Sequence, residues 1–197
     1  MKKYLYLFLV FVLFGCVSNH EFYTLQNHGI HIHKYVHIDP QFGGIERKVI
    51  QESLEEWTQV TGGFVSWTIK EWPENYATHA TISEPEETST NCSKHLLIMR
   101  NFADDAMIIN IETTLGSGIT GYAYGSNEPC GVEYILLVTD KLDNQNYFRL
   151  VVLHELGHVL GLSHNEQMSV MSYKNMRYAN GITKYDLEQL IKIHQPQ

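Results

Sequence analysis

The sequence predicts an α+β domain built around a single sheet. Short segments with alternating apolar and polar residues indicate strands, and two long segments with apolar residues at helical spacing indicate helices. Their order is strand, long helix, several strands, helix, irregular segment and final helix. The chain has 197 residues, 44% of them hydrophobic and 18% charged, which suits one globular core and is too short for two.

The first half of the domain begins with a strand predicted at Gly29–Asp39, followed by a helix at Gly44–Thr61 that stops at Gly62 and Gly63. One face of the strand carries Ile30, Ile32, Val36 and Ile38, and the other carries His31, His33, Tyr35 and His37. The histidines could bind a second metal, although a solvated face is the more ordinary interpretation. Further strands are predicted at Phe64–Lys70, His95–Met99, Met107–Glu112, Ile119–Tyr124 and Val132–Val138.

The second half is predicted to be mainly helical. One helix runs from about Asn146 to Gly161, and an irregular stretch follows it. Thr183 and Asp186 are spaced like a capping box, so a last helix is expected to start there.

The N-terminus resembles an export signal. Lys2 and Lys3 precede an apolar run, Tyr4–Phe14, which is too short to span a membrane. Leu13-Phe14-Gly15-Cys16 resembles the bacterial lipobox, although Phe14 is larger than the usual residue. We therefore expect a signal at 1–15, a tether at 16–28 and a catalytic domain at 29–197, with Cys16 lipidated on the bacterial cell envelope. A secreted protein with an ordinary cleaved signal is the alternative.

Charge and cysteine content limit the partners and the compartment. The formal charge of −8 becomes −10 when Lys2 and Lys3 are removed, which argues against nucleic acid and anionic lipid headgroups as partners. Besides Cys16, the chain has Cys92 and Cys130. In an oxidising compartment this pair predicts a disulfide, worth about 3–4 kcal/mol of stability. A thiolate ligand to a metal is the less favoured alternative.

The segment His154–His164 reads HELGHVLGLSH and predicts a metal centre. His154 and His158 project from one face of a helix, and Glu155 points beside them. His164 can reach the same metal only if the helix ends, and Gly161 can adopt the positive φ that such a turn requires. Three imidazoles leave a fourth position for water, so we expect one catalytic Zn²⁺.

This segment resembles the metzincin metalloproteases at every defining position. Ser169-Val-Met171-Ser-Tyr173 resembles their methionine turn, in which Met171 would form an apolar floor under the zinc ligands. The resemblance implies a zincin domain with a twisted mixed sheet and two long helices. It also implies a small C-terminal subdomain containing the final helix, with the active-site cleft between the two parts.

The similarity extends to the order of elements in matrixins. Thr120–Tyr124 stands in the place of their edge strand, with Gly121, Tyr122 and Ala123 expected along the substrate, and the helix at Gly44–Thr61 in the place of their first helix. Asn165 and Tyr173 depart from the matrixin pattern, and Tyr173 is more typical of astacins and serralysins. The subfamily is therefore left open.

The predicted function is zinc-dependent endopeptidase. Glu155 would act as general base and then acid, and Tyr173 would donate a hydrogen bond to the oxyanion, unless it is simply packed under the cleft. An extended peptide would add to the edge strand, and the loop Lys174–Asn180 would form the wall of the pocket for the residue after the cut. The partners expected are protein or peptide substrates, bound by a monomer.

Two other functions remain open: a surface-binding lipoprotein with a relic zinc site, and a zinc amidase acting on cell-wall peptides. Calcium is a further open question. Asp104, Asp105 and Glu112 could ligate it, although carboxylates are more often simply solvated.

Overall fold

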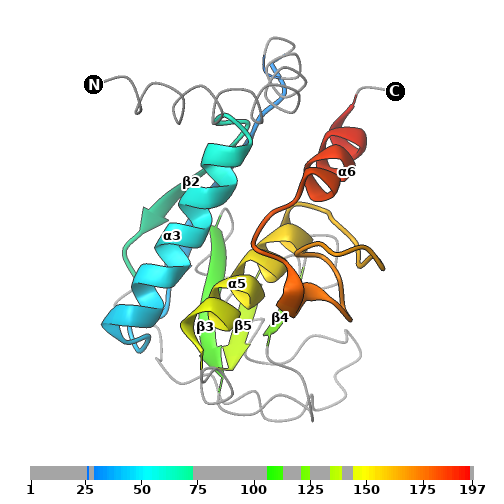
Figure 1. The fold of residues 1–197 in the computed structure, drawn as a ribbon. Coiled ribbons are helices and arrows are strands. Elements are labelled where there is room, and N and C mark those ends of the chain that lie inside the picture. Colours follow the sequence, from blue (N-terminus) through cyan, green and yellow to red (C-terminus); the bar gives the residue numbers. More distant parts are fainter. Residues whose placement is uncertain are drawn as a thin grey trace, which may run out of the picture.

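The computed structural model describes Gln26 and residues 29–72, 106–112, 121–124, 134–138 and 144–195. Five strands form one sheet in the order β2-β1-β3-β5-β4 (Figure 1). They are β1 (Ile32–Ile38), β2 (Val65–Lys70), β3 (Ala106–Glu112), β4 (Gly121–Tyr124) and β5 (Tyr134–Val138). β4 runs antiparallel to β5 at one end of the sheet, and the other pairs are parallel, so the predicted mixed sheet is confirmed.

The helices are α3 (Gly44–Val60), α5 (Gln145–Val159) and α6 (Lys184–His194), with a short 3₁₀ turn, η2, at Met176–Tyr178. Figure 1 shows α3 and α5 packed side by side against one face of the sheet, with α6 apart from them at the C-terminal end. Their positions agree with the prediction of two long helices and a separate final helix. Within the described residues, no helix is both long and apolar enough to cross a membrane.

The core fills the layer between the sheet and the two long helices. It is continuous from β1 through α3 and α5 to the methionine turn and α6. Trp57 of α3 is fully buried, and its Nε1 donates to the carbonyl of Leu153 at 3.2 Å. Because Leu153 directly precedes His154, this bond fixes the zinc-motif helix against its neighbour.

The predicted elements that fall within the described residues are present, with boundaries that differ from the prediction by at most three residues. The expectation that the histidine face of β1 is solvated is wrong at His37, which is only 8% exposed. The Nδ1 of His37 donates to the carbonyl of Glu71, the residue directly after β2, at 2.7 Å. His33 instead lies by Ser66, with Nδ1 and Oγ 2.8 Å apart.

Several predictions concern residues outside the described ranges. These are the signal at 1–15, nearly all of the tether at 16–28, the strand at His95–Met99, Cys16, Cys92, Cys130, Asp104 and Asp105. Glu112 ends β3, but its side chain is not among those described.

Candidate zinc site

The helix α5 carries the first part of the motif and is well defined at both ends. Asn144 caps its start, where its side chain accepts from the backbone N–H of Asn146 at 2.8 Å. At the other end Gly161 has φ +93°, and the N–H groups of Gly161 and Leu162 donate to the carbonyls of His158 and Gly157, both at 2.9 Å. This is a Schellman motif, and it confirms the predicted glycine turn.

The turn brings the three histidines together. The Nε2 atoms of His154 and His164 are 3.0 Å apart, those of His158 and His164 are 3.1 Å apart, and those of His154 and His158 are 3.2 Å apart. Within the described part of the chain, these side chains form the single group of His, Cys, Asp and Glu residues arranged to hold a metal ion. Among the residues that the structure describes, no such group forms around His31, His33 and His37, so the second metal considered for that face finds no support there.

Backbone carbonyls determine which ring nitrogens carry protons. Nδ1 of His154 lies 2.7 Å from the carbonyl oxygen of Val170, and Nδ1 of His158 lies 2.8 Å from that of Leu162. A carbonyl oxygen can only accept, so each Nδ1 must donate. In a neutral ring the lone pair then sits on Nε2, which is the atom that faces the other histidines.

Burial keeps these rings neutral. The pKa of His154 is lowered to about 4, chiefly by burial and also by the neighbouring histidines, against the opposing effect of the Val170 carbonyl. Burial also lowers the pKa of His158. Metal ligands must be unprotonated, so the environment of both rings favours the form that binds a metal.

The arrangement suits zinc. Lone pairs at 3.0–3.2 Å repel one another unless a cation lies between them. Imidazole nitrogens at about 2.0–2.1 Å from a tetrahedral zinc would stand about 3.3 Å apart, close to these separations. Hydrogen bonds from Nδ1 to carbonyls are also the usual support for histidine ligands of zinc.

Glu155 is buried beside the histidines, with 5% of its surface exposed. Desolvation by this burial raises its pKa to about 8, and a nearby cation would lower it again.

The edge strand β4 begins directly against the carboxyl of Glu155. A Cβ placed on Gly121 would lie 2.5 Å from Oε1 of Glu155, so only glycine allows this approach. Of the other predicted edge-strand residues, Ala123 lies in β4 and is partly buried, while Tyr122 is described only by its backbone.

The methionine turn packs tightly on the zinc-motif helix. Met171 is buried, and its Sδ occupies the space that a Cβ on Gly157 would need. The N–H of Asn165 donates to the carbonyl of Met171 at 3.1 Å, which ties the segment after His164 to the turn.

Sequence reasoning missed the second role of Asp186. Its Oδ2 accepts from Thr183 in the predicted capping box, and also from the N–H of Val170 at 3.3 Å. Val170 in turn holds His154 through its carbonyl. The contact between Asp186 and Val170 leaves no pattern in the sequence.

The close packing of Gly157 on Met171 did leave a signal in the sequence. A glycine inside a helix costs about 1 kcal/mol of stability and usually has a packing reason.

Tyr173 lies at the edge of the site. Its ring centroid is 6.0 Å from that of His164, and 55% of its surface is exposed. Its hydroxyl donates to Oε1 of Glu166 at 3.3 Å. This places the ring near the histidines, with the hydroxyl held by another group.

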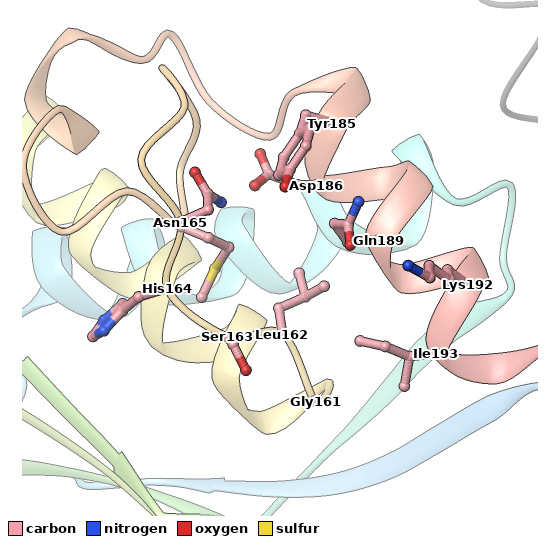
Figure 2. Close-up of a pocket in the computed structure, with 11 residues that line it drawn as sticks. Gly161, Leu162, Ser163, His164, Asn165, Tyr185, Asp186, Gln189, Lys192 and Ile193 are labelled. Atoms are coloured by element: carbon pink, nitrogen blue, oxygen red, sulfur yellow. The ribbon is translucent and has the colours of Figure 1, made fainter.

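A pocket of about 490 Å³ lies between residues 161–165 and α6 (Figure 2). His164 forms part of its wall, but Figure 2 shows the ring pointing away from α6. Polar side chains from α6, among them Gln189 and Lys192, line the opposite wall. The pocket therefore lies behind the third histidine and not among the converging nitrogens.

Three features of this mixed-sheet domain define the metzincin class of zinc metallopeptidases. They are a helix with two histidines, a glycine turn that leads to a third histidine, and a buried methionine beside them. A family model described as Matrixin matches residues 65–195, which is more than half of the chain. The chain belongs to the matrixin family.

Solved structures show the same fold. Archaemetzincin from Methanopyrus kandleri superposes with a TM-score of 0.54 and 16% identity, over 83% of this chain and 96% of that one. Metalloproteinase-II from Bacteroides fragilis gives a TM-score of 0.51 and 14% identity, over 83% of this chain and 52% of that one. The present chain thus spans about half the length of metalloproteinase-II. No curated protein sequence matches the chain.

Proposed function

We propose that this metallopeptidase is an endopeptidase that cleaves extended polypeptides outside the cytoplasm of a bacterial cell. His154, His158 and His164 would hold the zinc, and Glu155 would serve as the general base. The observation that carries the proposal is the convergence of three imidazole nitrogens beside a buried carboxyl. When bound, zinc would supply Lewis acidity, lowering the pKa of a water to about 7 and polarising the scissile carbonyl.

Glu155 would move the protons of the reaction. It follows His154 directly on α5, and its burial keeps it out of bulk solvent. As a carboxylate it accepts a proton from the attacking water, and as a carboxylic acid it returns that proton to the leaving amine. A binding protein with a relic site would have no need of this residue.

The substrate would bind along β4. This strand is at the end of the sheet, so an extended peptide can add to its outer edge by main-chain hydrogen bonds. Glu155 lies against the first residue of the strand, Gly121, which would bring the scissile bond close to the base. The segment Lys174–Asn180 would wall the pocket for the residue after the cut, and Tyr173 would donate to the oxyanion.

The location is also part of the proposal. Lys2, Lys3 and the apolar run Tyr4–Phe14 support export, and Gly15-Cys16 supports a lipid anchor on the cell envelope. A disulfide between Cys92 and Cys130 suits that oxidising compartment.

Incubation with unfolded casein, with and without a chelator, tests the proposal. We expect cleavage that the chelator abolishes and added zinc restores. Absence of casein cleavage by zinc-loaded protein would contradict an endopeptidase. Hydrolysis of cell-wall peptides without casein cleavage would indicate the amidase instead, and zinc binding without any hydrolysis would indicate the relic site.

A further inference from the structure

A bidentate ion pair joins the two long helices away from the zinc motif. Nε of Arg149, on α5, lies 2.9 Å from Oε2 of Glu56, on α3, and Nη2 lies 2.6 Å from Oε1. The two side chains are 29% and 23% exposed, so the pair is largely shielded from solvent. Paired bonds of this kind are among the more rigid polar contacts in proteins.

The same pair holds a third segment. Nη1 of Arg149 donates to the carbonyl of Asn180 at 3.4 Å. The next residue, Gly181, has φ +141°, and a Cβ there would lie 2.8 Å from Oε1 of Glu56 and 2.9 Å from Nη2 of Arg149. The backbone at 180–181 therefore rests directly on the ion pair.

This contact anchors one end of the segment 173–180. The other end is held at the methionine turn, where the N–H groups of Asn175 and Met176 donate to Oγ and the carbonyl of Ser172 at 3.0 and 3.2 Å. Between the anchors, Tyr173 and Tyr178 are exposed. Because Arg149 stands on the same helix as His154, the pair ties the far end of the segment to the helix that carries the zinc ligands.

We propose that Glu56 and Arg149 form a positioning pair that sets where the segment 173–180 stands relative to the metal centre, and thereby sets the preference for the residue after the scissile bond. The inference rests on the proposed function, in which Lys174–Asn180, the larger part of this segment, walls that residue's pocket. The pair touches neither the zinc ligands nor Glu155, so it acts through the segment and is not itself catalytic.

Glu56→Gln and Arg149→Lys test the pair. Glu56→Gln removes the carboxylate charge, and Arg149→Lys replaces the guanidinium fork with a single ammonium group. For each variant, kcat/KM is measured on peptides that differ only in the residue after the cut. We expect the ratio between the best and poorest peptide to shrink about tenfold, with wild-type zinc content. Glu52→Gln is the control, because Lys48–Glu52 on α3 is an exposed pair with 3.6 Å between its charged atoms.

Hydrogen exchange gives a readout that does not depend on activity. Loss of the pair should speed exchange of the amides of Met176, Tyr178 and Ala179 about tenfold and leave those of α5 unchanged. Gly181→Ala, which crowds the pair from the opposite side, should produce the same pattern. Unchanged exchange at these amides, or an equal loss of activity on all peptides, would overturn the positioning role. A wild-type protein that fails to cleave casein contradicts the proposed function, and the exchange result still decides the role of the pair.

Discussion

At the scale of single residues, Glu155 shows a conflict between stability and chemistry. Its carboxyl is buried, and burial raises its pKa to about 8 from an ordinary value of 4.5. Below pH 4.5 the carboxyl is neutral in both the folded and the unfolded chain, and the stability of the fold is fully present. As the pH rises from 4.5 through 8, the carboxyl ionises first in the unfolded chain, and this stability is lost. The proposed general base is therefore a source of instability in the zinc-free protein at neutral pH.

Glu155→Gln should remove both the base and this cost. Zinc binding should persist, because no ligand changes, while kcat falls by about 10²–10⁴. The zinc-free variant should match the wild type near pH 4 and exceed it by about 3 kcal/mol at pH 7, which denaturant unfolding at the two pH values would measure. A variant that is no more stable than the wild type at pH 7 would show that the buried carboxyl does not destabilise the fold. A variant with full proteolytic activity would remove Glu155 from the mechanism.

Tyr173→Phe tests the proposed catalytic role of Tyr173. The substitution keeps the ring beside His164 and deletes only the hydroxyl. In the described structure this hydroxyl donates a hydrogen bond to Glu166. If the hydroxyl swings to the oxyanion during the reaction, kcat should fall by about 10²–10³ with KM and zinc content nearly unchanged. A variant with the wild-type kcat would limit Tyr173 to packing at the edge of the site.

Among the residues of the site, the motif spacing predicted the three histidines, Glu155 and the turn at Gly161. The contacts of their second nitrogens could not be predicted, because the carbonyls of Leu162 and Val170 are brought there by the chain's path after the turn. Asp186 was predicted as a helix cap, but its bond to Val170 depends on tertiary packing. Local spacing thus predicted which side chains meet, and the fold determined what holds them.

At the scale of elements, the decisive contact is the one between β4 and α5. Gly121, at the start of the strand, packs on Val151 and Glu155 of the helix. This close approach places the proposed substrate strand within reach of the base. A larger residue would force the strand and the helix apart.

Gly121→Ala should separate these two elements. The added Cβ would lie 2.8 Å from Cγ1 of Val151 and 2.5 Å from Oε1 of Glu155, so one of the partners must move. We expect kcat/KM on casein-derived peptides to fall about 10- to 100-fold with zinc still bound. Gly44→Ala is the matched control, since a Cβ there meets nothing within 4 Å. Equal activity in the two variants would mean that β4 does not bind the substrate.

The elements themselves were largely predictable because their apolar periods are regular. Pairing order and burial were less so, since they depend on contacts between distant segments. His37 illustrates the limit. Strand alternation placed it on an exposed face, but His37 is buried, and its Nδ1 donates to the carbonyl of Glu71, the residue directly after β2. Alternation describes one strand at a time and cannot report what later covers it.

At the scale of the whole molecule, mass spectrometry of the mature protein tests its processing. We expect the N-terminus at Cys16 with a lipid attached and, without reduction, a peptide linkage between Cys92 and Cys130. Two or more acyl chains would anchor the protein stably, where one chain binds only reversibly. An unmodified N-terminus downstream of Cys16 would contradict the anchor, and free thiols at Cys92 and Cys130 would contradict the disulfide.

Metal analysis of the purified protein tests the central claim most directly. The claim is that the three converging Nε2 atoms hold a catalytic zinc. The protein should contain one zinc per chain, and His158→Ala should lose it, because two imidazoles cannot replace the complete set. His33→Ala, outside the site, should retain the metal. An active wild-type protein without zinc, or a His158→Ala variant that binds zinc as the wild type does, would contradict the account.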